Sequence, residues 1–113
     1  MRSGALLMVV GVLRLSFHVP GARSLKDKRH VVRGFRDRVR ARFGVSIAEV
    51  AEQDTLQLAV FGVTVVSSSR DVCAGVLEHV ARMAELNADA VLTSRETEFM
   101  TFGNEMFGDR DAC

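Results

Sequence analysis

The fold of this chain is decided largely by residues 8–43, which read MVVGVLRLSFHVPGARSLKDKRHVVRGFRDRVRARF. From Met8 to Phe17 the segment is dense in aliphatic and β-branched residues, a pattern that predicts a largely buried strand. Pro20-Gly21 then predicts a turn, because proline fixes φ at one position and glycine accepts a positive φ at the next. We therefore expect the stretch to begin with a strand and a turn that lead into a helix.

The second half of the stretch predicts that helix, which runs to about Arg42. Ser24 and Asp27 are spaced as a capping-box variant, with aspartate in place of the usual glutamate. Gly44 is expected to end the helix in the left-handed conformation. Apolar residues at helical spacing predict the face that is turned to the core. These residues are Leu25, Val32, Phe35, Val39 and Phe43.

The rest of the chain predicts a second unit of the same kind. Residues 45–52 and 56–66 read as two strands joined in a hairpin, and Ser68 is the expected cap of a second helix over residues 70–86. Residues 88–102 can form a last strand. The order strand, helix, strand, strand, helix, strand predicts an α+β fold, the ferredoxin-like βαββαβ sandwich. In this fold an antiparallel four-stranded sheet carries both helices on one face.

Length and composition predict one compact domain. The chain has 113 residues and a mass of 12.4 kDa, with 48% hydrophobic and 26% charged residues. We expect an N-terminal extension at residues 1–7, a single domain at residues 8–102 and a flexible C-terminal tail at residues 103–113. Two cysteines are too few for a disulfide framework, and we find neither a signal peptide nor a membrane span. A cytoplasmic protein is therefore expected.

The net charge of +1 hides two opposite halves of the chain. Residues 1–43 hold 11 Lys and Arg against 2 Asp and Glu, a net charge of +9, whereas residues 44–113 hold 4 against 12, a net charge of −8. Such asymmetry indicates a surface that binds a polyanion or associates with another protein chain.

Basic residues form a second stripe on the first helix, about a quarter-turn from its apolar face. Helical spacing keeps five cationic side chains in register along about 20 Å of helix. The stripe consists of Lys26, Arg29, Arg33, Arg36 and Arg40. An extended row of cations suits a phosphate backbone better than a compact ligand, so we expect polyanion binding here. The alternative is a solvated arginine-rich face without a partner.

The start of the same helix predicts a second, local anion site. The N–H groups of the first turn and the Ser24 hydroxyl lie beside Lys26, Lys28 and Arg29, so they can hold an anion together. The glycine-rich loop and the Gly-Lys-Ser/Thr element of a P-loop are missing, which excludes nucleotide binding of that kind. A simple N-cap role of Ser24 is the alternative.

No residue constellation in the sequence argues for catalysis or for a metal ion. The three histidines have no His or Cys partner at ligand spacing, and Cys73 lies in an apolar helical pattern typical of a core thiol. Glu49, Glu52 and Asp54 cluster near the hairpin, where a solvated turn is preferred over acid–base or metal chemistry. We therefore expect no enzymatic activity, no cofactor, no metal site and no small-molecule substrate.

Several segments of the chain resemble the YlxP-like family, small bacterial proteins of unknown function. The resemblance covers roughly residues 8–98 and is carried by Met8-Val9-Val10-Gly11, by Pro20-Gly21, by Ser24-Leu25-Lys26-Asp27-Lys28-Arg29, by Arg42-Phe43 with Val45 to Val50, and by Gln53-Asp54, Gln57, Ala59 and Gly62. Family members usually begin near Met8, and an aromatic residue often stands where this chain has Leu56. The resemblance implies a ferredoxin-like fold and no catalytic residue. Family genes often neighbour those of translation factors and of a ribosome-binding factor, which implies a role near the small ribosomal subunit.

The leading functional expectation is an accessory protein that contacts structured RNA, such as ribosomal RNA, through its phosphates. The alternative is an interaction module or homo-oligomer, in which the basic half of one chain docks on the acidic half of another; Glu96 and Glu98 on the last strand are the candidate acids. A third possibility is an enzyme or small-ligand binder that works from Ser24, Lys26, Arg29 and the hairpin carboxylates, although no pocket with perturbed titratable groups can be inferred from the sequence. No membrane partner is expected.

Overall fold

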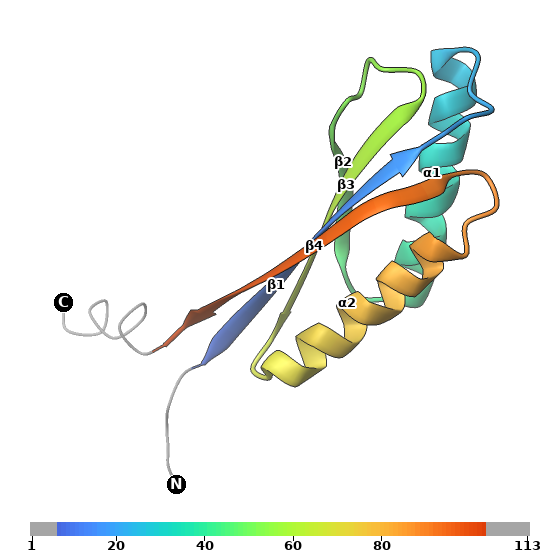
Figure 1. The fold of residues 1–113 in the computed structure, drawn as a ribbon. Helices are drawn as coiled ribbons and strands as arrows, with labels where there is room; N and C mark the ends of the chain where they lie inside the picture. Colours follow the sequence, from blue (N-terminus) through green and yellow to red (C-terminus); the bar gives the residue numbers. More distant parts are fainter. Residues whose placement is uncertain (1–6, 104–113) are drawn as a thin grey trace, which may run out of the picture.

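The computed structural model describes residues 7–103, and its elements follow the predicted order (Figure 1). They are β1 (Met8–His18), α1 (Leu25–Arg42), β2 (Ser46–Ala51), β3 (Leu58–Ser67), α2 (Arg70–Glu85) and β4 (Val91–Phe102). The expected N-terminal extension and C-terminal tail lie outside the described residues, apart from Leu7 and Gly103.

The four strands form one antiparallel sheet in the order β2-β3-β1-β4, with both helices on the same face (Figure 1). Strand β1 occupies the centre and pairs with β3 on one side and with β4 on the other. The β1–β4 register shifts between Ser16 and Phe17, and the β2–β3 register shifts between Glu49 and Ala51. Each helix connects two strands that have one other strand between them, which is the split βαβ arrangement. The predicted ferredoxin-like fold is confirmed.

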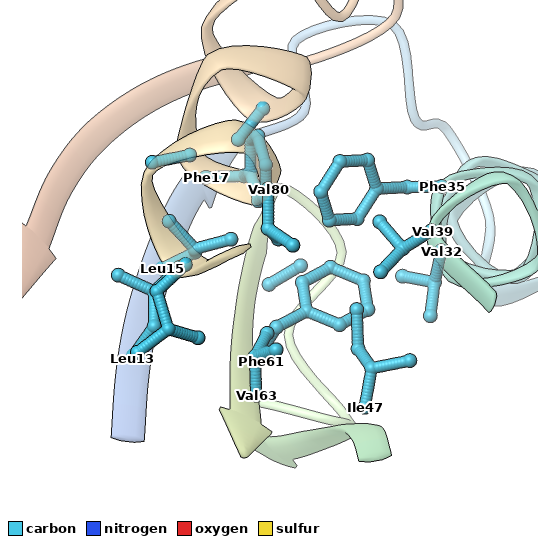
Figure 2. Packing of buried hydrophobic residues seen from close by; sticks show 14 of the residues in the cluster. Leu13, Leu15, Phe17, Val32, Phe35, Val39, Ile47, Phe61, Val63 and Val80 are labelled. Atoms are coloured by element: carbon cyan, nitrogen blue, oxygen red, sulfur yellow. The ribbon is translucent and has the colours of Figure 1, made fainter. Parts of the chain in front are cut away.

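Three phenylalanines join the helical layer to the sheet (Figure 2). Phe17 of β1, Phe35 of α1 and Phe61 of β3 are buried, and their ring centroids lie 5.2, 5.8 and 5.2 Å apart in edge-to-face arrangements. Aromatic pairs of this geometry contribute about 0.5–1.5 kcal/mol each beyond the area that they bury. The cluster therefore fixes the position of α1 over the sheet.

Helix α2 lies close to β1 because Gly11 has no side chain. A Cβ atom at this position would lie 2.9 Å from Leu77 Cδ1 and 3.3 Å from Cys73 Cβ, both on α2. Cys73 is fully buried, and its Sγ lies 3.6 Å from the carbonyl oxygen of Val9, so it is the core thiol that the apolar pattern predicts. At this position, the backbone of β1 packs directly against the Leu77 and Cys73 side chains of α2.

The backbone conformation at two glycines differs from the prediction. Neither Gly21 nor Gly44 has a positive φ. Helix α1 ends instead at Phe43, whose backbone is extended (φ −133°) and whose N–H donates to the Val39 carbonyl oxygen at 3.0 Å. Because that bond already closes the last turn, no left-handed residue is needed there. Within residues 7–103 the residue with a positive φ is Glu52 (62°), in the hairpin between β2 and β3.

Two other boundaries differ from the prediction. Ser69, and not Ser68, caps α2, and its Oγ accepts a hydrogen bond from the Val72 N–H at 3.3 Å. Strand β4 begins three residues later than expected because the chain first turns, with Asn87 Oδ1 accepting from the Asp89 N–H at 3.0 Å. Both differences leave the topology unchanged.

Candidate nucleic-acid interface

Helix α1 begins as the sequence predicts. Ser24 has an extended backbone, and its Oγ accepts a hydrogen bond from the Asp27 N–H at 3.1 Å. Asp27 Oδ2 in turn accepts from the Arg23 N–H at 3.1 Å. These bonds satisfy amide groups that the helix itself leaves without partners. The Ser24 hydroxyl is therefore engaged in capping, the simpler of its two predicted roles.

The rotation of α1 about its own axis is set by its apolar face. Val32, Phe35 and Val39 are buried, whereas Leu25 and Phe43 at the ends of that face are half-buried. Because this face is turned to the sheet, the basic stripe a quarter-turn away from it lies along the side of the helix. Its residues meet two different environments.

Four members of the stripe are exposed: Arg40, whose hydrogen bond is described below, and the three residues Lys26, Arg29 and Arg33. Within residues 7–103 none of the three lies within ion-pair distance of an acidic side chain. Together with His30 and Asp37 they line a shallow concavity on α1. Their spacing along the helix puts successive charges about one turn, or roughly 5–6 Å, apart. We name Lys26, Arg29 and Arg33 the cationic row.

The two remaining members of the stripe already have partners within the chain. Arg36 is 31% exposed, and its Nε donates to Asp37 Oδ1 at 3.2 Å. Arg40 donates from Nη2 to the carbonyl oxygen of Ile47 at 3.2 Å, which ties the end of α1 to strand β2. The stripe of five is therefore divided into an unpaired row of three and two residues that hold local structure.

Lys28 has no place in an anion site, contrary to the prediction. Its side chain is only 2% exposed, and its ammonium group donates to the carbonyl oxygens of Glu52 and Thr55, the latter at 2.7 Å. Nζ also lies 3.1 Å from Glu49 Oε2. That oxygen is shielded from solvent and has no hydrogen bond of good geometry, so the lysine charge compensates it. Lys28 thus joins α1 to the β2–β3 hairpin.

The helical spacing itself contains the signal that identifies Lys28 as a buried residue. Position 28 lies between Leu25 and Val32 on the apolar face, in the series 25, 28, 32, 35 and 39. A lysine at the centre of such a face is buried, and burial requires oxygen partners. The carbonyl groups of a hairpin distant in sequence supply those partners, and no pattern along the chain identifies them.

The acidic cluster of the hairpin serves the same local structure. Glu49 faces Lys28, and Glu52 Oε1 accepts a hydrogen bond from Thr55 Oγ1 at 3.0 Å.

In the part of the chain that the structure describes, no group of three or more His, Cys, Asp and Glu side chains is placed to hold a metal ion. None of the described helices is long and apolar enough to cross a membrane.

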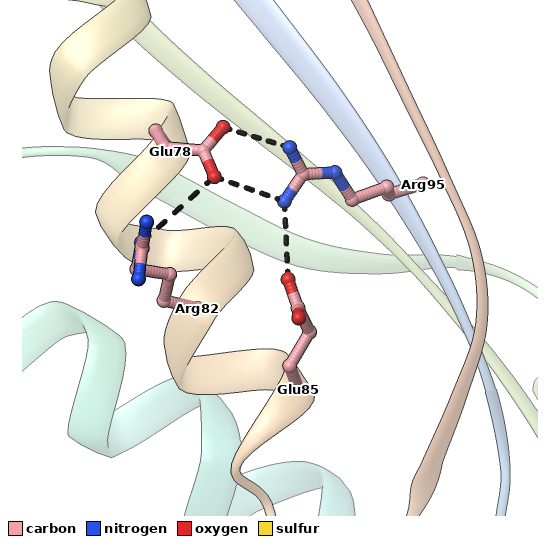
Figure 3. A network of polar contacts seen from close by, with 4 residues as sticks. All are labelled: Glu78, Arg82, Glu85 and Arg95. Carbon is pink, nitrogen blue, oxygen red and sulfur yellow. Dashed lines mark hydrogen bonds and ion pairs between the residues drawn. The ribbon is translucent and has the colours of Figure 1, made fainter.

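Two acidic residues of α2, Glu78 and Glu85, are paired with Arg95 of β4 (Figure 3). Arg95 of β4 donates to both carboxylate oxygens of Glu78, at 2.7 and 3.3 Å, and to Glu85 at 3.3 Å. The hydrogen bond from Arg95 holds the pKa of Glu78 below its ordinary value, and partial desolvation opposes that shift. Glu96, one of the two acids predicted for docking, forms an ion pair with Arg14 of β1.

Comparisons with known proteins identify relatives of this chain without a known activity. A family model described as a protein of unknown function (DUF503) matches residues 10–97. The uncharacterized protein YlxP of Bacillus subtilis (strain 168) is 34% identical over 91 residues, which is 80% of this chain and 99% of the relative.

Solved structures with a similar arrangement are distant in sequence. The de novo designed protein Foldit4 has a TM-score of 0.47 at 14% identity and covers 84% of this chain and 96% of its own. A C-terminal segment of the alpha subunit of aIF2 from Pyrococcus abyssi has a TM-score of 0.45 at 14% identity, with coverages of 80% and 49%. SnoaB, a cofactor-independent oxygenase from Streptomyces nogalater, has a TM-score of 0.44 at 18% identity, with coverages of 82% and 90%. Likenesses at this level carry no argument about function.

Proposed function

This chain belongs to the DUF503 family of proteins of unknown function, and from its surface we propose that it binds structured RNA through the phosphate backbone. The contact surface is the cationic row of α1, flanked by His30. RNA of the small ribosomal subunit is the first candidate, because genes of YlxP-like proteins often neighbour those of translation factors and of a ribosome-binding factor. The protein acts as a non-enzymatic accessory factor in the cytoplasm.

The unpaired state of the cationic row carries this proposal. Lys28 and Arg95 each contact oxygen atoms of their own chain, as does Arg14, whereas the row has no acidic partner within residues 7–103. Like charges three or four residues apart destabilise a helix by about 0.2–0.5 kcal/mol per pair. A phosphate backbone removes that repulsion and gains charge-assisted hydrogen bonds from the two guanidinium groups. An extended polyanion is thus the ligand class that fits the row best.

Phosphate contact, and not base reading, is the favoured mode of recognition. RNA-binding sheets stack bases on aromatic side chains of their central strands. Here Phe17 and Phe61 of the central strands are buried under the helices, and the opposite face of β1 and β3 carries no Phe, Tyr or Trp. We therefore expect weak dependence on sequence and strong dependence on salt.

Fluorescence anisotropy with a hairpin from small-subunit ribosomal RNA tests the proposal. Three phosphate contacts predict a slope of log K against log salt of about −2 to −3, which is a loss of roughly 15- to 60-fold in affinity between about 50 and 200 mM salt. The triple variant Lys26→Glu, Arg29→Glu and Arg33→Glu is expected to show no binding. A lack of wild-type binding at the lower salt concentration would refute the proposal.

A matched control separates the cationic row from general charge. Arg38→Glu, Arg42→Glu and Arg70→Glu make the same change in net charge at exposed positions outside the row. This control is expected to weaken binding far less than the triple variant, because its residues lie on another face of α1 and on α2. Equal loss in both variants would show that only net charge matters.

Docking of the basic half on the acidic half of a second chain is the alternative that the same variants address. Glu49, Glu78, Glu85 and Glu96 are already paired within their own chain, which leaves this alternative with fewer acids than the charge count suggests. If it holds, the triple variant lowers the oligomeric mass in native mass spectrometry and ribonuclease treatment has no effect.

A further inference from the structure

Both helices lie on one face of the sheet, and within residues 7–103 no element covers the opposite face (Figure 1). The core residues of β1 and β3 alternate with residues that point to this open face, and Val66, Leu58 and Met100 on it are 61%, 42% and 49% exposed. Val50 of β2, which is 53% exposed, lies against Gly62 of β3, where a Cβ would be 3.1 Å from Val50 Cγ1. All four strands thus contribute apolar side chains to the open face.

An uncovered face of an antiparallel sheet normally carries polar residues. Alternation of apolar and polar side chains is the expected pattern when one face packs on the core and the other meets water. Here β1 and β3 carry aliphatic residues on both faces. On the open face Val10 of β1 is the cross-strand partner of Val66 of β3, and Val12 lies two residues farther along β1. The register places Val66, Val10 and Met100 side by side across β3, β1 and β4, and an exposed apolar patch of this kind marks an interaction surface.

We propose that the open face binds the same face of a second copy of this chain, and that the protein is a two-fold symmetric dimer. The charges on the face favour this occupant over a nucleic acid. Arg14, Glu96 and Glu98 line one shallow groove, so cations and anions lie side by side without a basic excess. Arg14 already forms an ion pair with Glu96 of its own chain, so the charged part of the face is compensated. A two-fold axis places the apolar part of the face against the same apolar part of a second copy.

The size of the face also fits a dimer of single domains. Four strands at about 4.8 Å spacing, with central strands about 35 Å long, give a face of roughly 600–700 Å² per copy before side-chain relief is counted. A standard stable interface buries about 800 Å² per partner. The open face is therefore at the lower end of the size that a stable dimer needs, which is about 600–1,000 Å² per partner.

This dimer does not depend on RNA binding. Because both helices lie on the other face of the sheet, α1 stays on the outside of each copy, and the two cationic rows are carried on opposite sides of the dimer. The interface is also distinct from docking of a basic half on an acidic half, because it is apolar and excludes α1. Salt therefore distinguishes the two modes of association.

Sedimentation equilibrium of the full chain between about 1 and 100 μM tests the dimer. The expected mass is twice the 12.4 kDa of the chain, in about 0.15 M and in about 1 M NaCl alike. Val66→Glu and Met100→Glu each place a carboxylate in the apolar interface and are expected to raise the dissociation constant by at least about 100-fold. Circular dichroism verifies that each variant is folded.

Val72→Glu is the matched control, because Val72 is 53% exposed but lies on α2, on the other side of the sheet. It is expected to leave the dissociation constant unchanged. If the Val66 and Met100 variants fail to fold, the wild-type thermal midpoint replaces them, since it rises with protein concentration for a dimer. A monomer at every concentration, or a dimer that dissociates in high salt and survives Val66→Glu, would overturn the proposal.

Discussion

The two helices lie on the same face of the sheet but differ in how far their exposed charges are paired within the chain. On α2 the exposed Glu78 and Glu85 are both held by Arg95 from the neighbouring strand β4. On α1 the cationic row has no acidic partner within residues 7–103, although Lys28 of the same helix contacts three oxygen atoms. Charges that hold the fold together are thus paired inside the chain. The row is excess charge with respect to the fold, and so are Arg38 and Arg42, which also have no acidic partner within residues 7–103; the row differs in keeping three cations in register on one side of α1.

Removal of the buried charge of α1 is expected to have the largest effect on stability. Lys28→Met keeps most of the packing of the side chain but leaves Glu49 and two carbonyl groups without their cation. We expect the free energy of unfolding to fall by about 2–4 kcal/mol, measured by urea denaturation. Lys26→Met is the control on the same helix and is expected to change stability by less than about 0.5 kcal/mol. Equal effects at the two positions would contradict the distinction between buried and exposed cations.

The contact of α2 with the sheet is expected to be the next most sensitive feature. Gly11→Ala puts a methyl group 2.9 Å from Leu77 Cδ1 and 3.3 Å from Cys73 Cβ, so the buried Leu77 side chain must move and the packing of α2 on β1 is disturbed. We expect a loss of about 1–3 kcal/mol in the free energy of unfolding. Gly75→Ala on the solvent side of α2 has no atom within 4 Å of the new methyl group and is expected to stabilise the protein by about 0.5–1 kcal/mol. Thermal unfolding of both variants checks the opposite signs.

Neutralisation of the cationic row is expected to separate stability from binding. With Lys26, Arg29 and Arg33 all replaced by Gln, the repulsion along α1 disappears, and stability rises by a few tenths of a kcal/mol at low salt. RNA affinity is expected to fall in the same variant. A marked loss of stability would mean that the row supports the fold, contrary to its lack of partners in the described residues.

The pairing of Glu78 with Arg95 is expected to give the smallest effect, visible as a dependence of stability on pH. Because the pKa of Glu78 is lowered in the folded state, the pair stabilises the protein above the ordinary glutamate pKa of about 4.3. That contribution is lost as the pH falls through the lowered pKa of the folded state. Arg95→Met removes the shift, so the difference in stability between wild type and variant should shrink in acid. A difference that stays constant with pH would count against the pair.

Much of the fold follows from local patterns in the chain. The alternating and helical spacings predict all six elements, and the Ser24–Asp27 pair predicts the start of α1 to the residue. Errors gather at the ends of elements. Gly44, for example, is not left-handed because the Phe43 N–H already closes the helix. Local rules allow several ways to end a helix, and the surrounding packing selects one of them.

The candidate site was only partly predictable, because the spacing of charges along a helix does not identify the residues that contact them in the folded chain. Lys26, Arg29 and Arg33 are exposed as expected, but Arg40 is drawn to the backbone of Ile47 and Lys28 to a hairpin more than 20 residues away. Whether a basic side chain is available to a ligand depends on which oxygen atoms lie near it in space. Residues distant in the chain supply those atoms.

The sequence by itself determined the order of the elements, the face of α1 that meets the core and the charge asymmetry between the two halves. These properties depend on spacing along the chain, and a regular helix or strand converts spacing directly into direction. The tertiary structure alone decided that Lys28 is buried, that Arg95 joins β4 to α2, and that exposed apolar residues lie on a sheet face over which residues 7–103 place no other element. Burial and pairing depend on contacts between distant segments, and only the folded chain brings those segments together.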